Sequence, residues 1–258
     1  MLQDPPPTEP LHIDARGSAE AGTAAPTLST PAVDAGVLDN PAWSSLTGRH
    51  RHLAEGNEHV LRYPADVSPF VGVKDWEHPD VWEAILELFG HGATVSVSHA
   101  DPLLPAGWAP VFSVPGVQLV QTDRLAPLPD EEAIELGAAD SADMLALVER
   151  TRPGPFEPRT HELGRYVGIR REGRLIAMAG ERLHPEGWTE ISAVAVDAEH
   201  RRQGLASRLV LDVAFNIQQR GDRALLHASA TNTSAITGYE KLGFALRRRL
   251  TFGAVRTP

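Results

Sequence analysis

The chain alternates between segments with a helical spacing of apolar residues and segments with a strand-like spacing. After Gly204, the apolar residues Leu205, Leu209, Val213 and Ile217 recur every four positions, which predicts an amphipathic helix that ends at residues 220–221. Similar spacing predicts further helices over residues 40–56, 78–92 and 140–152.

Residues typical of helix ends stand at the borders of these segments. Asn40 is a favourable cap, and Pro41 after it suits the first helical position. Gly90 is a typical stop for the second helix, and either Asp140 or Ser141 can cap the third.

Short apolar or alternating runs predict the strands. Residues 171–173, Arg-Glu-Gly, predict a tight turn between two of them, which gives a β-hairpin over residues 166–183. The other predicted strands are 69–75, 93–99, 117–123, 133–136, 188–196, 223–228 and 244–252.

The composition changes along the chain and predicts three regions. Residues 1–36 are rich in Pro, Ala, Ser and Thr and contain few large apolar residues, so we expect a disordered tail. Residues 37–128 predict a smaller α/β unit, and residues 129–258 a second unit, with a proline-containing linker at 125–132 between them. Residues 153–164 contain too many prolines to continue the preceding helix and predict a loop, with room for one helical turn.

Charge and composition exclude several classes of function. The chain has no cysteine, which excludes disulfides, thiolate catalysis and zinc-thiolate sites. Its net charge of −10 argues against general nucleic-acid binding, and no apolar run is long enough to cross a membrane. No secretory signal is visible, so we expect a cytoplasmic protein without nucleic-acid or membrane partners, and a homodimer is one possible assembly. The histidines show no metal-ligand spacing beyond His-Arg-His at 50–52, which we interpret as a solvated helix surface, so we predict no metal site.

Gly204 stands between a predicted strand and a predicted helix, where a glycine needs a reason. The first turn of a helix has unpaired N–H groups and a positive dipole end, and both favour a bound anion. Without a side chain at Gly204, a phosphate could approach the backbone closely, and the small Ala206 would keep the next turn clear.

Two motifs in residues 130–258 resemble the GNAT superfamily of N-acetyltransferases. Arg201, Gly204 and Ala206 match the fixed positions of its Q/R-x-x-G-x-G/A signature. A second segment, NTSAITGYEKLGF at 232–244, is similar to a segment near the C-terminal end of the family, and the two motifs occur in the family's order. The resemblance implies a mixed, mostly antiparallel α/β sheet flanked by helices. It also implies that the strands at 188–196 and 223–228 diverge. Residues 37–128 resemble a degenerate half of the same fold more weakly.

The resemblance also implies acetyl-CoA as the co-substrate and an N-acetyltransferase activity. The pyrophosphate would sit on backbone N–H groups of residues 202–207, the pantetheine arm would pair with the strand at 194–196, and Asn232 would contact that arm. The implied coenzyme-binding residues are Val194, Ala195, Val196, Arg201, Arg202, Gln203, Gly204, Leu205, Ala206, Ser207, Asn232 and Tyr239.

Acetyl transfer to an amine needs a proton donor for the departing thiolate and a neutral amine. Tyr239 would face the coenzyme sulfur and supply the proton, although a tyrosine beside Phe244 can also be a packing residue. Many members of the family that the chain resembles carry a general-base glutamate at this strand position, which implies that Glu190 would take the proton of the amine through water, with burial raising the pKa of its carboxyl. The alternative is an ordinary strand-edge charge. Glu181 is a weaker candidate for the general base.

Other charged or polar segments receive simpler interpretations. Phe156, Arg159, Thr160 and His161 lie on the loop where the family shapes its acceptor pocket, but such a loop is often only a connection. Residues 247–249, three arginines, are interpreted as solvated or paired. We expect the acceptor to be a small-molecule or peptide amine. The alternative function is a non-catalytic module that binds acyl-CoA.

Overall fold

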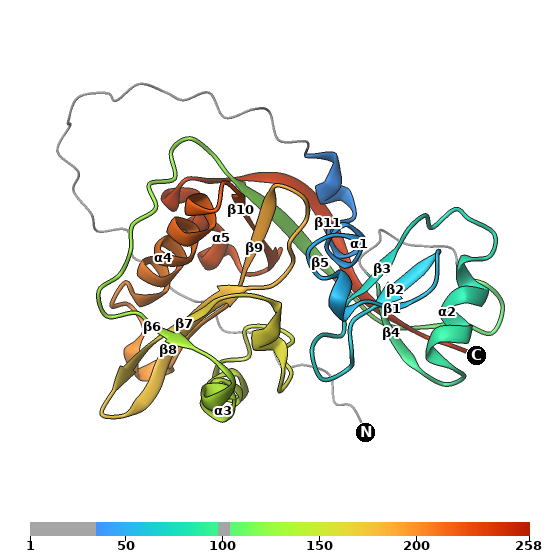
Figure 1. Ribbon diagram of the computed structural model, residues 1–258, viewed down its shortest axis with the longest axis horizontal. Helices are drawn as coiled ribbons and strands as arrows, with labels where there is room; N and C mark the ends of the chain where they lie inside the picture. Colours follow the sequence, from blue (N-terminus) through green and yellow to red (C-terminus); the bar gives the residue numbers. More distant parts are fainter. Residues whose placement is uncertain (1–34, 98–103) are drawn as a thin grey trace.

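The computed structural model describes residues 35–97 and 104–258. Its main feature is an eight-stranded sheet (Figure 1). The strand order is β4-β11-β5-β10-β9-β8-β7-β6, and only β9 and β10 pair in parallel, which confirms the predicted mixed, mostly antiparallel sheet. Its strands are β4 (Thr94–Val97), β5 (Ala109–Gln121), β6 (Ile134–Leu136), β7 (Tyr166–Arg171), β8 (Arg174–Glu181), β9 (Trp188–Val196), β10 (Arg223–Ser229) and β11 (Phe244–Arg256).

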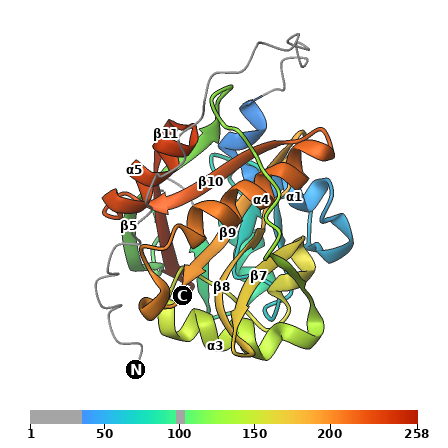
Figure 2. The same ribbon diagram turned by 90° about the vertical axis from the view of Figure 1, so that its left-hand side faces the viewer.

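Helices cover both faces of this sheet. On one face, α4 (Leu205–Gln219) packs on β8, β9 and β10, and α5 (Thr233–Leu242) packs on β11 and α4. Both helices bury apolar side chains in the largest core cluster. On the other face, α3 (Ser141–Thr151) packs on β8 and β9. Figure 2 shows α4 lying across β9 and β10, with α3 below them. The burial of two apolar helix faces against one sheet accounts for the stability of this part.

Strand β5 belongs to the same sheet as the strands that follow residue 128, where the sequence predicts a boundary between two units. Although it precedes that boundary, it lies between β10 and β11 and is antiparallel to both. It is also longer than the predicted strand at 117–123, and its added N-terminal part contains Pro110 and Pro115. Both prolines fall in the part of β5 that pairs with β11 alone, where a proline is tolerated. Whether residues 37–128 are a degenerate half of the same fold stays a prediction.

The N-terminal residues form a smaller layered structure beside the C-terminal end of β11 (Figure 1). A three-stranded sheet of β1 (Glu55–Gly56), β2 (Val60–Arg62) and β3 (Val71–Val73) packs with α2 (Val81–Phe89). Helix α1 (Pro41–Thr47) begins as predicted, with the Asn40 side chain accepting the Trp43 N–H. It ends at Gly48, and only the short 3₁₀ turn η2 (Arg51–Leu53) follows, so the predicted helix over 40–56 is too long.

Several local predictions are confirmed at the level of backbone angles. Glu172 and Gly173 have φ values of 50° and 80° in the predicted hairpin turn, and Gly90 ends α2 with φ 78°. Residues 153–164 form a loop containing the 3₁₀ turn η4 (Thr160–Leu163), as predicted. The remaining 3₁₀ turns are η1 (Gly36–Asp39), η3 (Ala138–Asp140) and η5 (Ala198–His200).

Two further expectations meet the limits of the described residues. The predicted disordered tail at 1–36 lies outside them, apart from its last two residues, as does the end of the predicted strand at 93–99. Within residues 35–97 and 104–258, every helix is too short or too polar to cross a lipid bilayer.

Candidate active site

The loop before α4, residues 201–204, has the backbone shape of an anion-binding turn; we call it the signature loop. Arg202 and Gly204 both adopt left-handed conformations, with φ values of 62° and 76°. Such residues turn successive N–H groups toward one point. The left-handed angle is itself a reason for glycine at position 204, in addition to the close approach that the sequence suggests. A Cβ built on Gly204 would meet no atom within 4 Å, so the space above it is open.

The first turn of α4 leaves polar groups unsatisfied beside this open space. Within the described part of the chain, the N–H groups of Leu205, Ala206 and Ser207 have no backbone acceptor, and no side chain caps the helix. The buried hydroxyl of Ser207 also lacks a hydrogen-bond partner there. Because unpaired donors at a helix N-terminus attract anions, these groups fit a pyrophosphate. The side chain of Ala206 lies in the core cluster, and its role of keeping the next turn clear for the phosphate stays a prediction.

A cleft opens where β9 and β10 diverge, as the sequence predicts. The strands pair from Trp188 with Arg223 as far as Ile191 with Leu226, and no pairing follows. At the same point β9 carries a bulge, with Ala193 at φ 52°. The wall of this β9–β10 cleft comes from β9, β10, α5, the end of α3 and the signature loop, and includes Ser192, Ala193, Val194, Arg201, Ala228, Ser229, Asn232, Ala235 and Tyr239.

The predicted coenzyme-binding residues take different positions relative to the cleft. Val194, Arg201, Asn232 and Tyr239 line it. The side chains of Ala195, Val196, Leu205 and Ala206 are buried in core clusters, so these residues can offer only backbone groups. Asn232 also caps α5, because its Oδ1 accepts the N–H of Ala235 at 3.2 Å. For the whole set, including Arg202, Gln203, Gly204 and Ser207, coenzyme binding stays a prediction.

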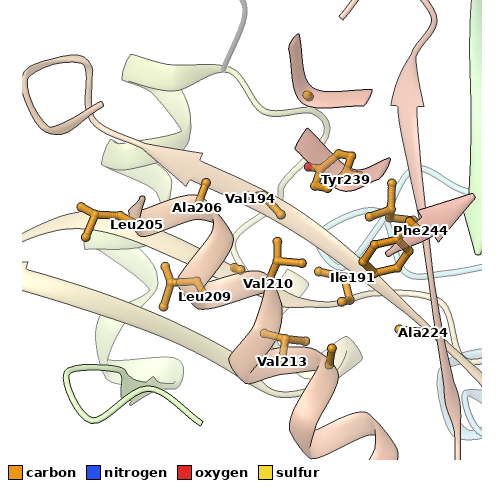
Figure 3. Close-up of a cluster of buried hydrophobic side chains, with 14 of the residues drawn as sticks. Ile191, Val194, Leu205, Ala206, Leu209, Val210, Val213, Ala224, Tyr239 and Phe244 are labelled. Atoms are coloured by element: carbon orange, nitrogen blue, oxygen red, sulfur yellow. The ribbon is translucent and has the colours of Figure 1, made fainter. Parts of the chain in front are cut away.

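Tyr239 packs in the core and also lines the β9–β10 cleft, so its position fits either of its two predicted roles. Its ring packs edge-on against Phe244, with centroids 6.2 Å apart, while the residue lines the β9–β10 cleft. In Figure 3 the hydroxyl lies on the side of Val194, away from Phe244. Burial raises the pKa of Tyr239 to about 12. The phenol is therefore protonated throughout the neutral range and is a weaker acid than the ordinary value of about 10 suggests.

The expected behaviour of Glu190 is wrong in one respect. Its carboxylate is fully buried, accepts two hydrogen bonds from Arg182 at 2.9 and 2.6 Å, and lies 2.7 Å from Nδ1 of His227. Burial alone would raise the pKa of Glu190, but the attraction of Arg182 and His227 outweighs burial and holds that pKa well below its usual range. Glu190 does not line the β9–β10 cleft, whereas Arg182 and His227 do. Its assignment as the general base stays a prediction that now needs an indirect route.

A second cavity, which the sequence does not predict, lies between the N-terminal residues and the sheet; we call it the N-terminal cavity. Arg182 and His227 line it as well as the β9–β10 cleft, so the two spaces share a wall. The guanidinium of Arg182 stacks on Phe70, 4.5 Å from the ring centroid. The lining of the N-terminal cavity is largely apolar and aromatic. It includes Leu38, Asp39, Asn40, Pro41, Phe70, Val71, Val73, Trp76, Gln118, Leu250 and Phe252.

The weaker candidates from the sequence have structural partners. Thr160 accepts the Glu157 N–H and donates to the Val67 carbonyl, and Arg159 pairs with Asp66 and Glu162. None of Phe156, Arg159, Thr160 and His161 lines the cleft or the N-terminal cavity. Glu181 is buried and bonded to Arg220 at 2.7 Å. Among residues 247–249, the first two arginines pair with Asp39, in line with the prediction.

Two histidine groups differ from the sequence interpretation. His50 is not a solvated surface residue: it is buried, 2.8 Å from the Tyr63 hydroxyl and 2.9 Å from the Leu163 carbonyl. Elsewhere His59, His78 and Asp80 bring possible metal-ligand atoms within 4.8 Å of one another. Sequence spacing could not reveal this trio, because about 20 residues separate His59 from the other two. None of the three lines either cavity.

Comparisons with known proteins agree with this geometry. The profile of the FR47-like protein family matches residues 166–252. Over 69 residues the chain is 41% identical to the catalytic subunit of the N-terminal acetyltransferase B complex from Arabidopsis thaliana, a match that spans 25% of this chain and only 39% of that relative.

Solved structures extend the likeness to most of the chain. A protein from Novosphingobium aromaticivorans assigned to the GNAT family of acetyltransferases is 32% identical, with a TM-score of 0.79 over 86% of this chain and 99% of that chain. A GCN5-related N-acetyltransferase from Kribbella flavida, 22% identical, shares the fold with a TM-score of 0.56 over 84% of this chain and 94% of its own. With the signature loop, the diverging strands and a relative matched over nearly its whole length, the chain belongs to the GNAT family of acetyltransferases.

Proposed function

We propose that the protein transfers an acetyl group from acetyl-CoA directly to a primary amine of a small molecule or peptide. The observation that carries the proposal is the opening between β9 and β10 beside the signature loop, with Tyr239 in its wall. The unpaired N–H groups of the first turn of α4 would hold the pyrophosphate, and the edge of β9 beyond Ile191, which β10 leaves uncovered, would pair with the pantetheine arm.

The N-terminal cavity is our candidate for the acceptor site. It shares Arg182 and His227 with the β9–β10 cleft, so an amine held there would meet a thioester held in the cleft. Aromatic and apolar side chains such as Phe70, Trp76 and Phe252 form much of its wall. Because burying apolar surface is favourable, an amine with an apolar or aromatic body suits this cavity better than a highly charged polyamine.

The binding half of the proposal is tested with two matched glycine variants. Gly204 and Gly221 stand before and after α4, with φ values of 76° and 82°, and neither has an atom within 4 Å of a built Cβ. Gly204→Glu and Gly221→Glu should therefore lose similar stability, about 1–2 kcal/mol for a left-handed non-glycine residue. Only Gly204→Glu places a carboxylate at the proposed pyrophosphate site. Calorimetry should show acetyl-CoA affinity at least tenfold weaker for Gly204→Glu and nearly unchanged for Gly221→Glu. Equal affinities in the two folded variants would contradict the assignment.

The chemical half is tested by following free thiol release from acetyl-CoA with a panel of amines. The panel contains 2-phenylethylamine, spermidine and a short peptide with a free N-terminus, and we expect 2-phenylethylamine to have the highest kcat/KM. Trp76→Ala should raise KM for that amine while leaving acetyl-CoA affinity unchanged, because Trp76 lines only the N-terminal cavity. Tight acetyl-CoA binding without thiol release above the amine-free rate would favour the alternative of a non-catalytic binding module.

A further inference from the structure

His227 is the residue of β10 that stands at the point where the two strands diverge. The residue before it, Leu226, makes the last pair with β9, and its side chain lies in the core on the α4 side. The side chain of His227 points to the opposite face, where it is only 7% exposed. It borders both the β9–β10 cleft and the N-terminal cavity. An imidazole at this point would stand between the two proposed substrates.

The buried carboxylate of Glu190 determines which proton His227 carries on one side of its ring. Nδ1 of His227 lies 2.7 Å from Oε1 of Glu190, and the same carboxylate accepts hydrogen bonds from Nε and Nη2 of Arg182. An ionised carboxylate is only an acceptor. Nδ1 must therefore carry a hydrogen and donate it to Glu190.

The other ring nitrogen faces Gln118, whose orientation is fixed by two further partners. The amide nitrogen of Gln118 donates to the Leu38 carbonyl at 2.9 Å, and its amide oxygen accepts from Arg247 at 2.9 Å. The nitrogen that lies 3.0 Å from Nε2 of His227 is therefore the Gln118 donor. Nε2 must accept that hydrogen bond, so it has a lone pair. The network assigns a neutral His227 protonated at Nδ1 and unprotonated at Nε2.

We propose that Nε2 of His227 accepts the proton of the attacking amine, and that Glu190 acts as a positioning residue that holds the ring and stabilises the imidazolium. This inference rests on the proposed function. As the amine nitrogen bonds to the acetyl carbon, its proton passes to Nε2. The carbon–sulfur bond then breaks, and the thiolate takes a proton from Tyr239. The products are the acetamide and free coenzyme A, and solvent restores the two side chains.

The surroundings of His227 suit this role better than those of Glu190. Both oxygens of Glu190 are already bonded and the residue has no exposed surface, so the amine cannot reach it. Nε2 of His227 accepts a hydrogen bond from one neutral group, the Gln118 amide. When an amine displaces that amide from Nε2, Gln118 keeps its hydrogen bonds to the Leu38 carbonyl and to Arg247. The charged groups around the ring are Glu190 on β9, Arg182 between β8 and β9, and Arg247 on β11, which reaches it through Gln118. The Phe252 ring packs edge-on against it, with centroids 6.1 Å apart.

The first test compares the pH dependence of kcat/KM for 2-phenylethylamine in three proteins. In the wild type, kcat/KM should fall at acid pH as His227 becomes protonated. His227→Gln can still donate to Glu190 but cannot take the proton, so its kcat/KM should fall about 10²-fold and lose this acid limb, with acetyl-CoA affinity within about twofold. His50→Gln is the control for loss of a buried histidine, and it should keep the wild-type profile even where it lowers stability. A His227→Gln enzyme with the wild-type rate and profile would overturn the proposal.

The second test separates Glu190 from His227. Glu190→Gln removes the anion beside the imidazolium, so the acid limb should move to lower pH and the rate should fall, while the limb itself remains. If the limb disappears in Glu190→Gln and remains in His227→Gln, Glu190 is the base and our proposal is wrong. A test that needs no amine substrate is nitrogen NMR of the ¹⁵N-histidine-labelled wild type, with the His227 signals assigned from the His227→Gln variant. It should show Nδ1 of His227 protonated and Nε2 unprotonated near neutral pH. The reverse tautomer would also overturn the proposal. If the wild type binds acetyl-CoA but turns over none of the amines, the proposed function itself fails, which is a different outcome from either variant result.

Discussion

Acid should weaken the attachment of the N-terminal residues to the sheet, because His50 is buried there as a neutral ring. The pKa of His50 is lowered from 6.5 to about 4, mainly by burial and also by the nearby positive charge of His52 and Arg49, while the Leu163 carbonyl acts in the opposite direction. The unfolded chain therefore binds a proton at a higher pH than the folded chain does. The stability that the neutral, buried His50 ring contributes is complete above pH 6.5. It is lost progressively as the pH falls and is fully lost below about pH 4.

The magnitude follows from the two pKa values. The difference between 6.5 and about 4 corresponds to about 3 kcal/mol at the acid limit. His184, whose ring lies 4.8 Å from that of His50, has a pKa lowered to about 3, mainly by burial and next by His50. Because protonation of one ring makes protonation of the other harder, His184 also stays neutral in the folded chain over this range, and its loss adds to that of His50.

Urea unfolding followed by tryptophan fluorescence at several pH values from 7 to 4 measures this loss. The wild type should lose about 3 kcal/mol or more over that range. His50→Gln can accept from Tyr63 and donate to Leu163 without titrating, so its loss should be smaller by about 3 kcal/mol. Parallel pH curves for the two proteins would refute the reasoning, because the titrating group would then lie elsewhere.

Three further predictions concern the active site. Tyr239→Phe should keep acetyl-CoA affinity within about twofold but lower kcat by about 10²-fold, measured where chemistry limits the rate; a wild-type kcat would leave Tyr239 as a packing residue. Arg182→Met should lower the free energy of unfolding by about 3–5 kcal/mol and Tm by roughly 10 °C, measured by calorimetry, because it leaves the Glu190 carboxylate buried without its guanidinium. The double variant with Glu190→Leu should regain most of this stability. Asn232→Ala should cost about 1 kcal/mol of stability through the lost cap of α5, and urea unfolding equal to the wild type would show that the cap contributes nothing.

The sequence predicts those features that depend on near neighbours along the chain. Asn40, Gly90 and Gly173 act through local backbone geometry, so their positions could be interpreted from the residues beside them. The two GNAT motifs lie in one continuous region and indicate the cleft correctly. The apolar helix face after Gly204 also needs only its own spacing.

Features that depend on distant contacts could not be predicted. The pKa of Glu190 is governed by Arg182 across the preceding turn and by His227 on another strand, and neither pairing is visible from strand spacing. The N-terminal cavity combines residues from both predicted units, with Phe70 and Trp76 on one side and Arg182 and His227 on the other. The composition of a segment gives no information about which surface it will cover.

The position of β5 between β10 and β11 has a consequence for how the protein acquires its structure. On the ribosome β5 emerges first, and about 100 residues follow before its partner β10 is made. Pairings with such a large sequence separation slow folding, and the waiting strand presents an unpaired edge to other chains. A fragment that starts at residue 129 would have the opposite defect, because β10 and β11 would face each other across a missing strand. We therefore expect recombinant yield to depend on keeping both halves in one polypeptide, and the nascent chain to depend on chaperones until β11 has been synthesised.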